Sequence, residues 1–112
     1  MVEDIVLTNS SFLGFVHEHR FVVIHFWAKW NRYDDRVKTA LDTLPVEIAN
    51  LVAIGTFDTD PPEHWELCRG HNILNLPFLA FYRDGDLVRT LPGIRPDDVL
   101  HRIRELIDGH TS

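Results

Sequence analysis

The segment Trp27–Asp35 (WAKWNRYDD) gathers several chemically capable side chains in one place. It follows an apolar run, Phe21–Trp27 (FVVIHFW), that predicts a strand buried on both faces, and it leads into residues with helical spacing. Backbone N–H groups at a helix start point at whatever binds there, so such junctions often carry chemistry. This junction offers an amide, a guanidinium, a phenol and two carboxylates. It has no thiol, no serine nucleophile and no glycine-rich loop.

The other candidate groups are one cysteine and seven histidines. Because Cys68 is the one cysteine of the sequence, an intramolecular disulfide and a metal site built mainly from thiolates are excluded. His17 and His19 lie two residues apart. His64 and His71 lie seven apart, so neither pair has the HExxH spacing of a zinc-binding helix. We therefore predict no metal site and no cofactor.

Length and composition limit the classes of protein to consider. A chain of 112 residues predicts a single domain over residues 1–112. The net charge of −6 and the scattered basic residues argue against a nucleic-acid partner. No stretch reaches the ~18 apolar residues of a membrane span, and the first ten residues lack the apolar core of a signal peptide. The single cysteine fits a reducing compartment, so we predict a cytoplasmic location.

Strands separated by helices must position these groups. Apolar and β-branched runs predict strands over residues 4–7, 21–27, 51–57, 78–82 and 86–91. Helical spacing and start or stop residues predict helices after residue 10, over 33–44, over 63–69 and after 96. Asp84 and Gly85 between the last two strands are a strong hairpin signal. The order βαβαβαββα predicts a central mixed β-sheet flanked by helices on both faces.

Three segments with these elements resemble the thioredoxin family in their order and separation. They are VVIHFWAKW before the second helix, VAIGTFDTD in the third strand, and ILNLPFLAFYRDG before the hairpin, with Gly93 after it. The resemblance covers nearly the whole chain. It implies a thioredoxin-like fold with a cis peptide at Leu76–Pro77, next to the loop that starts at Trp30.

The chain departs from this family at the redox motif. Thioredoxins carry Trp-Cys-Gly-Pro-Cys where this chain has Trp30-Asn31-Arg32-Tyr33-Asp34. Dithiol exchange needs one thiolate to attack and a second thiol to resolve the mixed disulfide, so we expect no dithiol activity and assign no catalytic residue. Asn31 is a preferred N-cap residue, and Asp34 and Asp35 suit the first turn. We predict a degenerate active-site loop whose own side chains cap the helix.

Two buried positions leave alternatives open. His25 stands where the resemblance implies a buried acid that assists proton transfer. We predict a hydrogen-bonded core residue there, with pH sensing or a contact to Asp34 as alternatives. The possible reactive thiol, Cys68, is expected to be buried, inert and remote from the Trp30 loop, with regulatory oxidation or a mixed disulfide as the alternative.

What the resemblance leaves is a substrate groove formed by Trp30, Leu76, Pro77 and Gly93. Thioredoxins hold an extended partner segment there by main-chain hydrogen bonds. Our leading hypothesis is a redox-inactive protein-binding or chaperone-like module whose partner is a protein or an extended peptide segment. One alternative is a thiol–disulfide participant acting through Cys68, or an accessory to an oxidoreductase in cell redox homeostasis. Another is a scaffold without peptide recognition.

Overall fold

The computed structural model describes residues 4–109, which form one five-stranded mixed sheet. The strands are β1 (Asp4–Val6), β2 (Phe21–Trp27), β3 (Ala53–Asp58), β4 (Phe78–Arg83) and β5 (Asp86–Pro92). They lie in the order β1-β3-β2-β4-β5. β3 pairs in parallel with β1 and β2, whereas β4 pairs antiparallel with β2 and β5. The mixed sheet with an antiparallel hairpin edge, predicted from the sequence, is confirmed.

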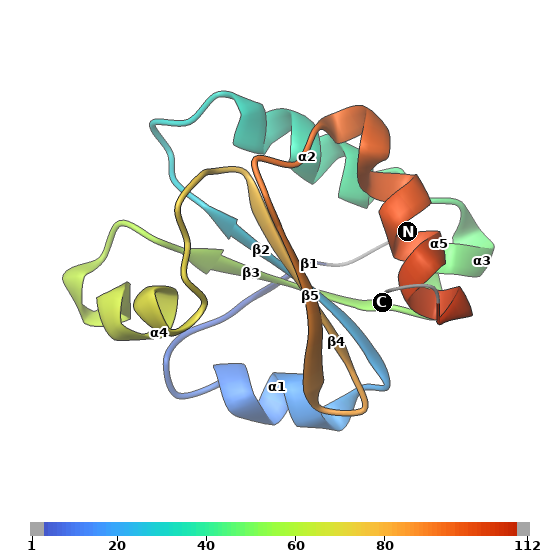
Figure 1. Cartoon of the computed structure of the whole chain (residues 1–112), viewed down its shortest axis with the longest axis horizontal. Coiled ribbons are helices and arrows are strands. Elements are labelled where there is room, and N and C mark those ends of the chain that lie inside the picture. Colours follow the sequence, from blue (N-terminus) through green and yellow to red (C-terminus); the bar gives the residue numbers. More distant parts are fainter. Residues whose placement is uncertain (1–3, 110–112) are drawn as a thin grey trace.

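Helices cover both faces of the sheet (Figure 1). On one face lie α1 (Phe12–Glu18) and α4 (Trp65–Gly70), and on the other α2 (Tyr33–Asp42), α3 (Val46–Ala49) and α5 (Val99–Asp108). Short 3₁₀ turns, η1 (Pro62–His64) and η2 (Pro96–Asp98), lead into α4 and α5. None of the helices between residues 4 and 109 is long and apolar enough to cross a membrane.

The helix α3 was not predicted, and Pro45 explains both its start and the end of α2. The fixed φ and missing N–H of proline stop the preceding helix. The carbonyl of Pro45 then accepts a hydrogen bond from the N–H of Ile48 at 2.9 Å, which opens a new helical turn. The sequence pattern instead predicts one helix that extends through Leu44. In the structure Leu44 lies beyond the end of α2 and is buried.

Side chains of β2 alternate between the two faces of the sheet, as strand geometry requires. Val22 and Phe26 belong to an aromatic-rich cluster on the α1 and α4 side. Val23 packs on the opposite face in the cluster that includes residues of α2 and α5. His25, two residues after Val23, shares that face and is therefore directed toward α2.

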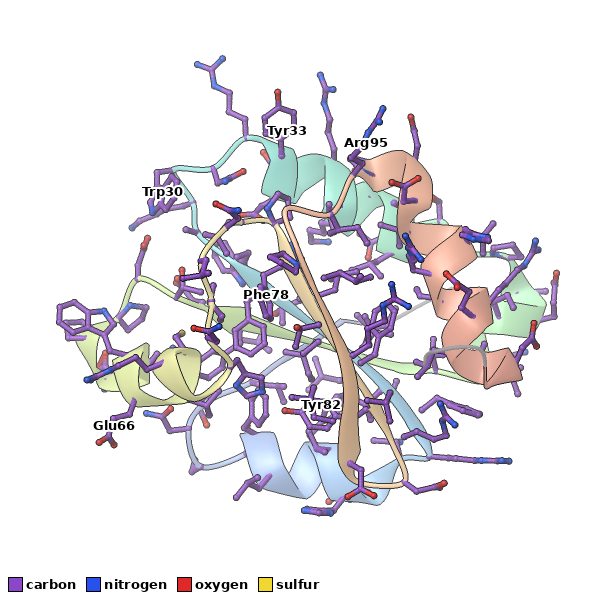
Figure 2. The ribbon with its side chains drawn as sticks, in the orientation of Figure 1. Trp30, Tyr33, Glu66, Phe78, Tyr82 and Arg95 are labelled. Atoms are coloured by element: carbon purple, nitrogen blue, oxygen red, sulfur yellow. The ribbon has the colours of Figure 1, made fainter. Side chains whose placement is uncertain are left out.

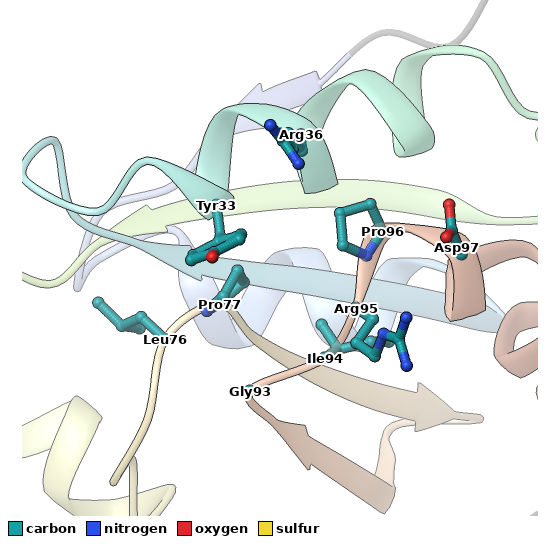
Figure 3. A pocket seen from close by; sticks show the side chains of 9 residues that line it. All are labelled: Tyr33, Arg36, Leu76, Pro77, Gly93, Ile94, Arg95, Pro96 and Asp97. Atoms are coloured by element: carbon teal, nitrogen blue, oxygen red, sulfur yellow. The ribbon is translucent and has the colours of Figure 1, made fainter.

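Two tight turns fix the ends of the last strands. Asp84 and Gly85, with φ of 52° and 86°, make the hairpin turn that joins β4 to β5. Positive φ at both central residues matches the twist of the flanking strands, which is why Asp-Gly is favoured there. The peptide bond between Leu76 and Pro77, just before β4, is cis. These two residues lie close to the start of α2 (Figure 3).

Candidate functional site

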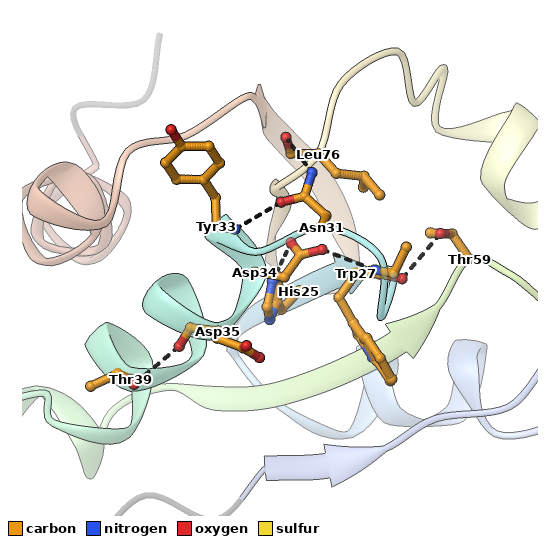
Figure 4. A network of polar contacts seen from close by, with 10 residues as sticks. His25, Trp27, Asn31, Tyr33, Asp34, Asp35, Thr39, Thr59 and Leu76 are labelled. Atoms are coloured by element: carbon orange, nitrogen blue, oxygen red, sulfur yellow. Dashed lines mark hydrogen bonds and ion pairs between the residues drawn. The ribbon is translucent and has the colours of Figure 1, made fainter.

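The carboxyl of Asp34 lies inside the molecule beneath the degenerate loop (Figure 4). Its Oδ2 accepts a hydrogen bond from the backbone N–H of Ala28 at 2.9 Å, and its Oδ1 lies 3.2 Å from Nε2 of His25. Both side chains are buried, with 4% of Asp34 and 2% of His25 exposed. Of the alternatives considered for His25, the contact to Asp34 is therefore present. Asp34 does not cap the helix with its side chain, contrary to our expectation.

Asn31 joins the loop to the chain on the other side of the site. The helix α2 begins at Tyr33, and its N-cap residue is Arg32, one position after the predicted N-cap residue Asn31. Even so, Oδ1 of Asn31 accepts a hydrogen bond from the N–H of Tyr33 at 3.0 Å. Its Nδ2 donates to the carbonyl oxygen of Leu76 at 3.2 Å. One amide thus satisfies a free N–H at the helix start and holds the residue before the cis-proline.

Trp30 stands out from the loop with 69% of its surface exposed. Its Nε1–H donates to a carboxylate oxygen of Asp60 at 3.1 Å. The backbone N–H of Thr59 donates to the carbonyl of Trp27 at 2.9 Å, so the segment after β3 is bonded both to the end of β2 and to Trp30. Arg32 and Tyr33 are also exposed on the same loop.

A groove of about 550 Å³ runs from Leu76 past Pro77 to the start of η2 (Figure 3). Its walls are Tyr33, Arg36, Leu76, Pro77, Gly93, Ile94, Arg95, Pro96 and Asp97. The structure brings three of the four predicted groove residues to this groove, whereas Trp30 lies outside its lining. The N–H of Ile94 donates to the carbonyl of Pro77 at 3.2 Å, which fixes the far wall. Within residues 4–109 nothing accepts the N–H of Leu76.

Sequence reasoning missed five of these lining residues: Arg36 and Ile94–Asp97. A signal for the first was available, because Arg36 follows Tyr33 by three positions and such residues share a helix face. The others follow Gly93 directly, so the predicted turn extends into the wall of the groove.

Comparison with known proteins agrees with this geometry. The thioredoxin family model matches residues 3–105. The chain belongs to the thioredoxin family. It is 28% identical to thioredoxin of Bacillus subtilis over 103 residues, which are 92% of this chain and 93% of that protein. A solved thioredoxin of Malassezia sympodialis has a TM-score of 0.79 at 20% identity, covering 100% of this chain and 94% of that one.

A third relative differs greatly in length. Monothiol glutaredoxin-S17 of Arabidopsis thaliana is 25% identical over 91 residues, or 81% of this chain. This chain spans only 18% of the length of that plant protein.

In this member of the thioredoxin family, the single thiol is in a setting that disfavours its ionised form. Cys68 is half-buried on α4 and packs against the cluster on the α1 and α4 side of the sheet. Burial, together with the negative charge of Asp58, raises the pKa of the Cys68 thiol above its ordinary value of 9.0. Reactive cysteines need the opposite environment, one that lowers the pKa. Cys68 does not line the groove.

The two histidines nearest to α4 have structural partners. Nδ1 of His64 lies 2.6 Å from the carbonyl oxygen of Asp58. Nδ1 of His71 lies 2.9 Å from the carbonyl oxygen of Leu67, and its Nε2 contacts the hydroxyl of Tyr82. Burial raises the pKa of Tyr82 to about 12. Within the part of the chain that the structure describes, no three His, Cys, Asp or Glu residues are grouped to hold a metal ion.

Proposed function

We propose that this chain is a redox-inactive thioredoxin-like domain that binds an extended segment of another protein along the groove beside Leu76 and Pro77. The observation that carries the proposal is the N–H of Leu76, a residue that lines the groove, because this N–H has no acceptor among residues 4–109. We propose a single domain acting in the cytoplasm, with a protein-binding or chaperone-like role.

The backbone of Leu76 offers both groups that strand addition needs. Its N–H has no acceptor among residues 4–109 and can take the carbonyl of a partner segment. Its carbonyl oxygen receives one hydrogen bond, from Asn31, and retains a second lone pair for a partner N–H. Main-chain pairing of this kind supplies affinity, and nearby side chains supply selectivity. Tyr33 on the groove wall and Trp30 on the adjoining loop add exposed aromatic surface that can supply selectivity.

Redox inactivity is supported at each position where a thiol could act. Asn31 and Asp34 contain no sulfur, and the carboxyl of Asp34 is already bonded to buried groups. The raised pKa of Cys68 keeps its thiol protonated near neutral pH. One cysteine also supplies no resolving partner within the same chain.

The proposal is tested by comparing two double variants that carry the same types of substitution. Trp30→Ala with Leu76→Asp alters the site, whereas Trp65→Ala with Leu74→Asp alters two exposed residues outside the groove lining. We expect the first variant to capture about tenfold less protein from a lysate than the wild type does. This factor corresponds to a loss of ~1.4 kcal/mol in binding free energy. The second should leave capture unchanged. If the wild type and both double variants captured equal amounts of protein, the captured proteins would not bind in the groove, and the proposal would fail.

A second candidate function is single-thiol redox chemistry through Cys68, or an accessory role beside an oxidoreductase. One observation favours it: a relative over 81% of the chain is named a monothiol glutaredoxin. An insulin-reduction assay on the wild type and Cys68→Ser separates the two candidates. Binding through the groove predicts no reduction by either protein. Reduction by the wild type that disappears in Cys68→Ser would establish the redox function instead.

A further inference from the structure

We propose that the groove selects an acidic extended segment, whose Asp or Glu side chains pair with Arg36 and Arg95. This inference rests on the proposed function and adds the chemistry of the partner. Arg36 projects from α2, and Arg95 follows Gly93 on the opposite wall (Figure 3). Arg95 also lies on the same outer edge of the molecule as Tyr33 (Figure 2).

Neither arginine is neutralised by a neighbour. Across residues 4–109, no carboxylate forms an ion pair with Arg36 or Arg95. The guanidinium of Arg36 lies over the ring of Tyr33, 6.0 Å from the ring centre. One carboxylate, that of Asp97, also lines the groove. The two guanidinium groups still outnumber it, and Arg32 adds a third exposed guanidinium on the adjoining loop.

The contrast with other cations of the chain makes these arginines informative. Lys38 pairs with Asp42 at 2.7 Å, and Arg102 pairs with Glu105 at 2.8 Å, each on its own helix. Arg36 has no acid three or four residues away on its helix. The residues at those positions are Arg32, Tyr33, Thr39 and Ala40. In a chain with 17 acidic and 11 basic residues, a groove with excess positive charge is complementary to an acidic partner.

The nearest acids of α2 are directed elsewhere. Asp34 is buried against His25 and the N–H of Ala28. Asp35 follows Tyr33 by two residues, which places it about 200° around the helix axis from that residue. Figure 4 shows Asp35 on the far side of the helix from Tyr33 and Leu76. The groove therefore faces the positive side of this helix start.

Arginine and an extended segment fit each other in geometry as well as in charge. The planar guanidinium binds a carboxylate through two parallel hydrogen bonds. In an extended segment, alternate side chains project to one side about 6.6 Å apart. A segment paired with the backbone of Leu76 therefore directs every second side chain along the groove toward the arginines. We infer acidic residues at alternate positions of the partner.

A displayed library of random peptides of about nine residues, long enough to span the groove in extended form, tests this inference. Four proteins select from it: the wild type, Trp30→Ala with Leu76→Asp, Arg36→Gln with Arg95→Gln, and Arg69→Gln with Arg104→Gln. The last pair removes the same charge from exposed residues outside the groove lining. We expect Asp and Glu to be enriched about fivefold with the wild type and the last variant, and to return to the input frequency without Arg36 and Arg95.

The other outcomes separate the two proposals. Peptides recovered by the wild type, lost with Trp30→Ala and Leu76→Asp, but without acidic enrichment, would overturn the acidic partner and leave the groove function standing. Recovery no higher than that of the Trp30→Ala and Leu76→Asp variant would overturn both. A wild-type dimer in sedimentation experiments that Arg36→Gln with Arg95→Gln dissociates would assign the groove to a second copy of this chain, and would also overturn the acidic partner. Urea unfolding of each variant confirms that it is folded.

Discussion

Two regions of this chain are candidates for thiol chemistry, and a different feature disfavours that chemistry in each of them. At the start of α2 the sulfur is absent, and Asp34 forms two polar contacts with buried groups beneath the loop. On α4 the sulfur of Cys68 is present, but half-burial and Asp58 raise its pKa. In the first region, Asp34 forms structural contacts in place of a thiol. In the second, Cys68 packs as a small apolar side chain against the cluster on the α1 and α4 side. The difference supports our proposal that the start of α2 acts through its contact with Leu76 beside the groove and not through a thiol.

The largest effect is expected from Asp34→Ala. This substitution leaves His25 and the N–H of Ala28 buried without their partner, which typically costs about 3–5 kcal/mol of unfolding free energy. Urea unfolding measures the loss. Asp35→Ala is the matched control, because it removes a carboxylate from an exposed position of the same turn and should change stability by about 0.5 kcal/mol or less. If both variants lost the same amount of unfolding free energy, the buried contacts of Asp34 with His25 and Ala28 would contribute nothing to stability.

A smaller effect is expected from Asn31→Ala, which sharpens the role assigned to the loop. The variant loses the acceptor for the N–H of Tyr33 and the donor to the carbonyl of Leu76. We expect a loss of about 1–2 kcal/mol in urea unfolding, as for other helix-start side chains.

Asn31→Asp separates these two bonds, because its carboxylate keeps the acceptor and removes the donor. It should retain most of the stability while freeing the Leu76 carbonyl, so hydrogen exchange should become faster at the N–H of Ile94, which donates to the carbonyl of Pro77. Unchanged exchange would mean that Asn31 does not hold the segment of Leu76 and Pro77.

The sequence predicted all the strands, every helix except α3 and much of the site, because these depend on local patterns. The apolar run of β2, the Asp-Gly hairpin and the segments that resemble the family sufficed to predict the sheet. The orientation of Asp34 could not be read in this way. Spacing from Asn31 predicts a cap, but the contact to His25 depends on which side of β2 faces α2, which is a tertiary property. The bond from Asn31 to Leu76 spans 45 residues, so no local rule indicates it.

The groove walls show the same limit. Arg36 and Arg95 are 59 positions apart in the sequence, and each alone reads as an ordinary exposed arginine. Their common placement arises because the turn at Gly93 and the hydrogen bond from Ile94 to Pro77 bring the last connection against α2. Their relation therefore becomes visible only in the folded chain.

The smallest effect is expected from Cys68, where the comparison between the two regions can be broken. Because burial raises the pKa of its thiol, little thiolate exists near neutral pH. Iodoacetamide should therefore modify the folded protein at pH 7 more slowly than the urea-unfolded chain, and the rate should still be rising above pH 9. Mass spectrometry follows the reaction, with Cys68→Ala as the blank. That variant should lose less than about 1 kcal/mol of unfolding free energy, since the side chain is only half-buried.

If the folded thiol instead reacts as fast as the unfolded one at pH 7, Cys68 is available for thiol–disulfide exchange. The two regions would then differ in function, with redox chemistry moved from the loop to α4.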